Sequence, residues 1–148
     1  LSKAQAIRVD FYQKDLKYDL DLGGGEYNIP NVPVSFPIIY PHPPYSTMSF
    51  WIASGPRGAM VTQAFYTHKN IDLSDATATY SIKTPKEAYI ELTEGRGYIA
   101  SYNGNDNNVS IKSVYLAYYL GEGLQEYILP VYVFEGDNGF FGYIPAIR

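Results

Sequence analysis

Apolar side chains recur at every second position in several short segments of this chain. Ile7, Val9 and Phe11 alternate with two charged residues, and the same spacing returns at residues 48–53. A period of two places successive side chains on opposite faces of a strand, so each segment predicts a half-buried β-strand. A helix over residues 2–8 is the competing interpretation of the first segment.

Glycine and proline mark where these strands turn. The sequence between residues 48–53 and 59–67 contains Gly55, Pro56 and Gly58, which predicts a β-hairpin. Residues 28–45 contain six prolines. Proline lacks a backbone donor and fixes φ, so we expect this segment to be extended and to cover a surface rather than pair centrally. Residues 19–25 predict a polar, glycine-rich loop.

One helix is indicated by capping residues at both of its ends. Thr84 can accept a hydrogen bond from the backbone of Glu87, whose carboxylate can accept one in return, and this exchange is a capping box. Pro85 suits the first helical position, and Gly95 can adopt the left-handed conformation that ends a helix. The sequence therefore predicts a short helix over about residues 85–94.

The chain after this helix predicts strands again. They are expected at residues 97–102, 109–120, 127–134 and 140–144, with a shorter strand before the helix at 79–83. Within residues 109–120 the apolar positions change phase near Lys112 and Ser113, which indicates a β-bulge or burial of both faces.

These elements together predict the fold class α+β, predominantly β. The expected architecture is an antiparallel sheet meander packed on one short helix, with a β-hairpin and a proline-rich extended segment in the first half. We expect a single domain over residues 1–148, because the length suits one core. A boundary near residues 77–84 would divide it into two subdomains.

Three runs in the second half have a family likeness. They are Ile82-Lys83-Thr84-Pro85-Lys86-Glu87-Ala88, Val114-Tyr115-Leu116-Ala117-Tyr118-Tyr119 and Leu129-Pro130-Val131-Tyr132-Val133-Phe134-Glu135-Gly136. Over about residues 80–146 the chain resembles exported bacterial modules of the PepSY type and the extracytoplasmic accessory proteins that restrain sensor histidine kinases. The resemblance implies a cell-envelope location and a regulatory or inhibitory binding role, and it supplies no catalytic residues.

Composition argues against several classes of function. The net charge of −4 and the scattered Lys and Arg residues argue against a nucleic-acid partner, which requires a basic surface. The chain has no cysteine for a disulfide or a thiolate site, and no apolar stretch long enough to span a membrane. Because it begins with Leu1 rather than Met, we expect a signal peptide or anchor to lie outside this segment.

No catalytic set is recognisable in the sequence. His42 and His68 are the two histidines; His42 lies among prolines and His68 beside a strand end. Neither has a nucleophile or a metal-ligand partner at the required spacing, so we expect no enzyme activity and no cofactor.

Two polar loops carry weak calcium patterns. Asn103, Asn105 and Asn107 occupy alternate positions, as the first ligands of a calcium loop do, and Asp19 and Asp21 form a second fragment. The twelfth position of the first loop is apolar where a calcium loop has a bidentate glutamate. Turn chemistry of Asn, Asp and Gly is therefore the preferred interpretation.

Aromatic residues are the best candidates for recognition. The chain has 16 tyrosines, which suit strands and also binding surfaces. Trp51 lies out of phase with its apolar neighbours, so it would face outward, beside Tyr66 on the next strand, unless a second layer covers it. Tyr115 and Tyr119 are further candidate contacts on residues 109–120.

These observations favour a non-enzymatic, extracytoplasmic binding or regulatory module that engages a protein partner. One alternative is a carbohydrate-binding module with an exposed aromatic patch. The other is a structural subunit of the cell envelope that self-assembles through edge strands.

Overall fold

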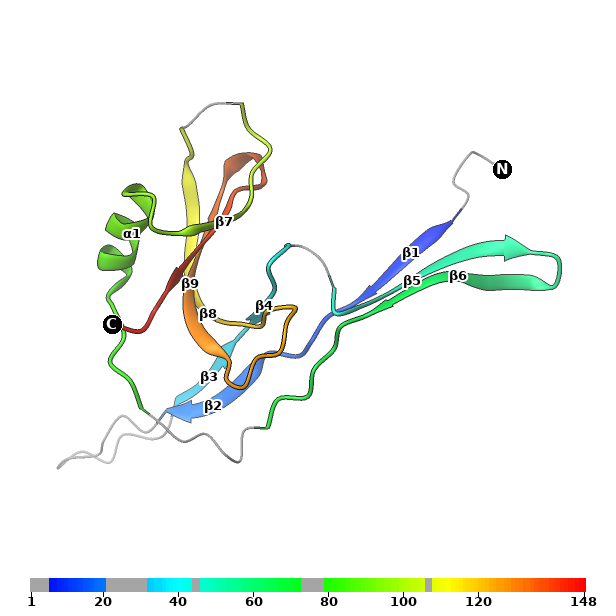
Figure 1. The fold of residues 1–148 in the computed structure, drawn as a ribbon, viewed down its shortest axis with the longest axis horizontal. Helices are drawn as coiled ribbons and strands as arrows, with labels where there is room; N and C mark the ends of the chain where they lie inside the picture. Colours follow the sequence, from blue (N-terminus) through cyan, green and yellow to red (C-terminus); the bar gives the residue numbers. More distant parts are fainter. Residues whose placement is uncertain (1–5, 21–31, 44–45, 73–78, 106–107) are drawn as a thin grey trace. The chain divides into compact units, whose positions relative to one another are not determined.

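A computed structural model describes residues 6–20, 32–43, 46–72, 79–105 and 108–148. The described chain is mostly β, with antiparallel sheets and one α-helix, as the sequence predicted (Figure 1). It forms two compact units. Unit 1 comprises residues 1–13 and 44–78, and unit 2 comprises residues 14–43 and 79–148.

Unit 1 contains a three-stranded antiparallel sheet. Its strands are β1 (Ile7–Phe11), β5 (Met48–Gly55) and β6 (Gly58–Tyr66), in the order β1-β5-β6. The predicted hairpin is therefore confirmed, and residues 7–11 form a strand rather than the competing helix.

A β-bulge interrupts the hairpin near its middle. Trp51 pairs with Gln63 but Ile52 pairs with Val61, so Thr62 is an extra residue on β6. The Thr62 hydroxyl donates a hydrogen bond to the Trp51 carbonyl at 3.1 Å. The extra residue reverses the alternation of β6 at this point, and it thereby places Val61 on the same face as Ile52.

Unit 2 contains one helix, a five-stranded sheet and a two-stranded sheet within its described residues. Its elements are β2 (Leu16–Leu20), β3 (Val32–Phe36), β4 (Ile38–Ile39), α1 (Pro85–Thr93), β7 (Tyr98–Ser101), β8 (Ile111–Tyr119), β9 (Leu129–Gly136), the 3-10 turn η1 (Asp137–Gly139) and β10 (Phe141–Pro145). The larger sheet has the order β4-β8-β9-β10-β7. Strands β8, β9 and β10 form the expected meander, whereas β7 pairs with β10 and β4 lies parallel to β8.

The proline-rich segment is extended where the structure describes it. It forms β3, which pairs with β2, and β4, which occupies an edge of the five-stranded sheet. Both positions tolerate missing backbone donors. Strand β2 includes residues 19 and 20, which were expected to begin the glycine-rich loop. Asp19 continues the strand and pairs with Pro33 of β3. Residues 79–83 are not a strand; Ile82 makes a single bridge to Ile147.

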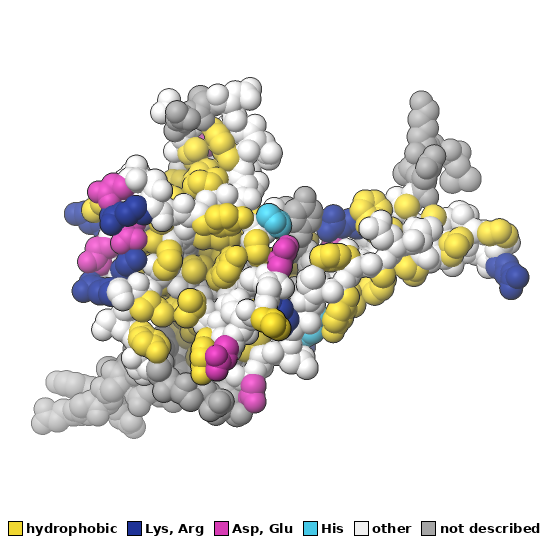
Figure 2. Space-filling model, in the orientation of Figure 1, with side chains coloured by type: hydrophobic (Ala, Val, Ile, Leu, Met, Phe, Trp, Pro, Cys, Tyr) yellow, Lys and Arg dark blue, Asp and Glu magenta, His cyan; other side chains and the backbone are white. Residues whose placement is uncertain are grey.

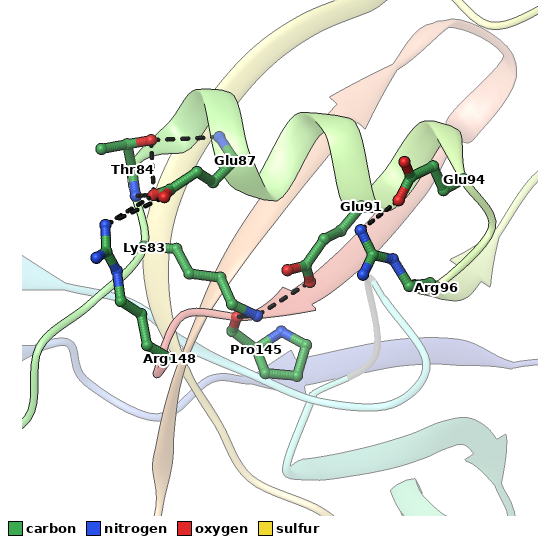
Figure 3. A network of polar contacts seen from close by, with 8 residues as sticks. All are labelled: Lys83, Thr84, Glu87, Glu91, Glu94, Arg96, Pro145 and Arg148. Atoms are coloured by element: carbon green, nitrogen blue, oxygen red, sulfur yellow. Dashed lines mark hydrogen bonds and ion pairs between the residues drawn. The ribbon is translucent and has the colours of Figure 1, made fainter.

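The predicted helix and its caps are confirmed. Thr84 Oγ1 accepts a hydrogen bond from the Glu87 backbone N–H at 3.2 Å, and Glu87 Oε2 accepts one from the Thr84 N–H at 2.6 Å. Gly95 has a φ of 75°, the left-handed conformation expected after the last turn. Two cross-connections then tie the start of the helix to the residues that follow β10. The Lys83 N–H donates to the Ala146 carbonyl, and Arg148 binds the Glu87 carboxylate (Figure 3).

Unit 2 has buried side chains on both faces of its larger sheet. On the face toward α1 these are Ala88, Tyr132, Phe134, Phe140, Ile144 and Ala146. On the other face they are Ala117, Val131, Val133 and Tyr143. Strand β9 is therefore buried on both sides, as its unbroken apolar run indicated. The predicted bulge in β8 lies at Lys112, where the register with β9 shifts, and it lets Ile111 and Leu116 pack on the same core.

Candidate binding surfaces

One face of the sheet in unit 1 is composed of apolar side chains. Directly paired residues share a face, so the register assigns the members of this face. Where all three strands pair, we call it the apolar face, and its residues are Ile7, Val9, Phe11, Met48, Phe50, Ile52, Val61, Ala64 and Tyr66. None of the nine carries a charge. Hydrophobic side chains are visible along the part of the molecule that contains β5 and β6 (Figure 2).

The apolar face is largely open to solvent. Ile7 is 69% exposed, Val61 55% and Tyr66 66%. Phe11 and Phe50 pack edge to face, with ring centroids 6.0 Å apart, and this contact shields part of both rings. Among the described residues of unit 1, none of the buried side chains is hydrophobic. A sheet with one apolar face normally packs that face against a second layer, which the described part of unit 1 does not supply.

The opposite face of the same sheet, which we call the charged face, has a different character. Arg8 forms an ion pair with Asp10 at 2.8 Å, and its guanidinium lies 5.8 Å from the centre of the Trp51 ring. Asp10 also accepts a hydrogen bond from the Ser46 hydroxyl at 2.7 Å. The charged face therefore has its polar groups paired, and Trp51 is half-buried beside a cation.

The register separates two of the predicted contact residues. Trp51 lies on the charged face, whereas Tyr66 pairs with Met48 and lies on the apolar face. The expected patch of Trp51 beside Tyr66 is therefore not formed. The Tyr66 ring instead neighbours His68, with ring centroids 6.2 Å apart. The nine-residue apolar face could not be assembled from the sequence alone, because the bulge at Thr62 decides which residues of β6 belong to it.

In unit 2 the structure brings the other two predicted contacts into a cluster. Tyr115 and Tyr119 lie on the face of β8 that points away from α1. Tyr143 packs between Tyr98 and Tyr119, with ring centroids 6.0 Å and 6.3 Å away. We call these four residues the tyrosine face. Tyr98 and Tyr143 were missed by sequence reasoning, because β7 and β10 pair out of chain order and no local pattern indicates it.

Hydrogen bonds orient the hydroxyls of the tyrosine face. The Tyr115 hydroxyl donates to the Glu135 carboxylate at 2.6 Å, and the Tyr143 hydroxyl donates to the Tyr40 carbonyl at 3.1 Å. Burial, with the Glu135 carboxylate, raises the pKa of Tyr115 well above the usual range. Burial, with the neighbouring Tyr98 and Tyr119, does the same for the pKa of Tyr143. Burial also raises the pKa of Tyr119. Tyr115, Tyr119 and Tyr143 therefore stay neutral at physiological pH, and the tyrosine face offers ring surface and hydroxyls.

The histidines and the polar loops have identifiable surroundings. His42 Nε2 lies 4.0 Å from the Glu122 carboxylate on the surface of unit 2. Asp19 belongs to β2, and the Asn103 N–H donates to the Asn138 carbonyl at 2.9 Å. Asn105 lies in the loop after β7, while Asn107 and Asp21 are outside the described residues. Over the ranges that are described, no three His, Asp or Glu side chains gather in a way that would hold a metal ion.

Comparison of the chain with protein-family models, with curated proteins and with solved structures found no match. In the described part of the chain, no helix has the length and apolar character needed to cross a bilayer. Function is therefore inferred from the apolar face of unit 1 and the tyrosine face of unit 2.

Proposed function

We propose that this chain is a non-enzymatic binding module that engages a protein partner through the apolar face of unit 1. The uncovered apolar face is the observation that carries the proposal. All three strands pair over residues 48–52 of β5, and with strands about 4.8 Å apart and about 3.3 Å per residue this gives a flat footprint on the order of 250 Å². The accessible surface of the side chains exceeds this flat area, and contiguous exposed apolar patches of a few hundred Å² are often functional in soluble proteins.

The chemistry of the face favours a protein over other classes of ligand. Small molecules bind in concave pockets, whereas this face is one side of an open sheet. Nucleic acids require positive charge, which the nine residues lack. An extracytoplasmic, regulatory setting belongs to the same proposal, and the likeness of residues 80–146 to PepSY-type modules supports it.

A pair of variants on one strand tests this proposal. Val61 and Met60 are neighbours on β6, and their exposed fractions are similar, at 55% and 49%. They lie on opposite faces of the sheet, because Val61 belongs to the apolar face and Met60 packs over Gly55 on the charged face. Affinity capture from extracts of the source cells should retain the same partner with the wild type and M60K. V61K, which places a charge in the apolar face, should lose it.

Equal capture by all three proteins would remove the apolar face as the binding surface. Circular dichroism of each variant checks that the sheet is retained. Both substitutions introduce the same lysine next to the same bulge, so a difference between them reports the face and not the charge alone.

A second candidate function is carbohydrate binding at the tyrosine face. Its specific support is the packing of the Tyr98 and Tyr119 rings against Tyr143, because sugars pack on aromatic rings while hydroxyls bind their polar edges. Tyr98 is 48% exposed and therefore the accessible ring. On a glycan array, Tyr98→Ala should abolish binding. Tyr89→Ala, equally exposed but on α1, should leave it unchanged, and loss in both variants would contradict this site.

A further inference from the structure

We propose that the occupant of the apolar face is a second copy of this chain, with the two apolar faces packed against each other. This inference rests on the proposed function, because it names the partner of the same surface. The resulting dimer is a two-layer β-sandwich in which each copy supplies one three-stranded sheet. Packed sheets of this kind lie about 10 Å apart, with their inner side chains interdigitated.

The charge distribution suits a symmetric pair. A two-fold axis brings each residue near the axis close to its own copy, so any charge there would meet a like charge. Strand β6 contains no charged residue at all. The two charged residues of β1 lie on the charged face, because Arg8 pairs with Trp51 of β5 and Asp10 pairs with Ser49. Packing two apolar faces together brings no like charges into contact.

The available area is sufficient for a weak but specific dimer. The flat footprint is on the order of 250 Å² for each copy, and the accessible surface is larger because four of the side chains are 48–69% exposed. Two such faces packed together bury an area at the low end of specific interfaces, which begin near roughly 1,200 Å² of total buried surface. The half-buried residues in the middle of β5, Met48, Phe50 and Ile52, would then become the centre of a core.

The structure favours association through the apolar faces over pairing along the strand edges. Strand β6 is an edge of its sheet, but the bulge at Thr62 interrupts its regular backbone, and bulges protect edges from adding further strands. Edge pairing would also leave both apolar faces in water. We therefore assign self-association to the apolar face instead of the edge strands that the sequence indicated.

Sedimentation velocity over a wide range of concentrations tests the inference. The wild type should pass from the monomer mass of 16.6 kDa toward twice that value as its concentration rises. V61K should raise the dissociation constant at least tenfold, while M60K should leave it unchanged. Ile7→Glu is a second variant that places a charge on the apolar face, and it should weaken the dimer in the same way. Ile7 is 69% exposed, so folding does not depend on its burial.

The outcomes separate this inference from the proposed function. A wild type that remains monomeric at its highest soluble concentration overturns the second copy as occupant, and so does a dimer that V61K and I7E leave intact. If the monomeric chain still captures a different protein in a V61K-sensitive way, the apolar face remains a protein-binding surface. If that capture is insensitive to V61K as well, both proposals are removed.

Discussion

Both units of this protein contain strands with alternating apolar residues, but the two units reach different degrees of burial. In unit 2 the sheet has buried hydrophobic side chains on both faces, and Val133, Phe134 and Ile144 are fully buried. In unit 1 the buried residues, among those described, are Ser46, Thr47 and Ser49. Alternation therefore makes a sheet with one apolar face, but it does not provide the layer that covers that face.

The difference lies in what packs against each sheet. In unit 2, α1 contributes Ala88 and Leu92 to the core. Its N-terminus is held close to the sheet because the Tyr132 hydroxyl donates to the Lys83 carbonyl at 2.7 Å. The Lys83 ammonium joins the helix to β10, since it pairs with Glu91 and also donates to the Pro145 carbonyl at 3.2 Å (Figure 3). The described residues of unit 1 contain no helix. We therefore expect substitutions of similar size to have unequal effects in the two units.

The largest contrast is expected between two phenylalanines. Phe134→Ala removes a fully buried ring from unit 2 and should lower the free energy of unfolding by about 3–5 kcal/mol. Phe65→Ala, at a position 50% exposed in unit 1, should cost less than about 1 kcal/mol. Urea denaturation monitored by circular dichroism measures both. Equal losses would show that unit 1 has a core as extensive as that of unit 2.

Alkaline pH should act on unit 2 through its buried tyrosines. Burial, with the nearby Tyr18, raises the pKa of Tyr118 from 10.0 to about 12. The folded state disfavours the phenolate, so this contribution to stability is complete below pH 10 and is lost as the pH rises through 12. Urea midpoints measured from neutral to strongly alkaline pH should fall in this window, and less steeply in Tyr118→Phe. An identical fall in both proteins would show that ionisation of Tyr118 does not cause the loss of stability.

Loss of the helix cap should have a smaller effect, confined to unit 2. Thr84→Ala removes the side chain that accepts from the Glu87 N–H and should destabilise unit 2 by about 1 kcal/mol. Thr93→Ala, at the other end of α1, removes a hydroxyl that only donates to the Ile90 carbonyl and should cost less. Hydrogen exchange of the α1 amides measures the difference, and equal exchange in the two variants would contradict a role for the capping box.

The smallest effect is expected for the surface ion pair between Arg148 and Glu87, whose atoms lie 3.1 Å apart. The hydrogen bonds from Thr84, with a smaller contribution from Arg148, lower the pKa of the Glu87 carboxyl. Stability linked to this carboxylate is therefore present above its unfolded pKa and lost as the pH falls through the folded value. Arg148→Gln should be slightly less stable than the wild type at neutral pH and indistinguishable from it in acid. A difference that persists in acid would contradict the pairing.

Much of the local structure followed from residues close together in the sequence. The capping box joins Thr84 to Glu87, the hairpin turn joins neighbouring strands, and the phase change at Lys112 marks a bulge. Strand β2 was missed because its charged residues and the glycines after it were interpreted as a loop. The pairing of β7 with β10 was also not predicted, since it joins strands separated by about forty residues.

The sequence by itself determined most of the strands, where the helix begins and ends, and that the strands of unit 1 have an apolar side. These properties arise from interactions between residues a few positions apart, so local patterns contain them. Only the tertiary structure decided which apolar side is covered, that Trp51 and Tyr66 lie on opposite faces, and that four tyrosines meet in unit 2. Those outcomes depend on strand register and on contacts between distant segments, because burial is a property of the assembled layers and not of any one strand.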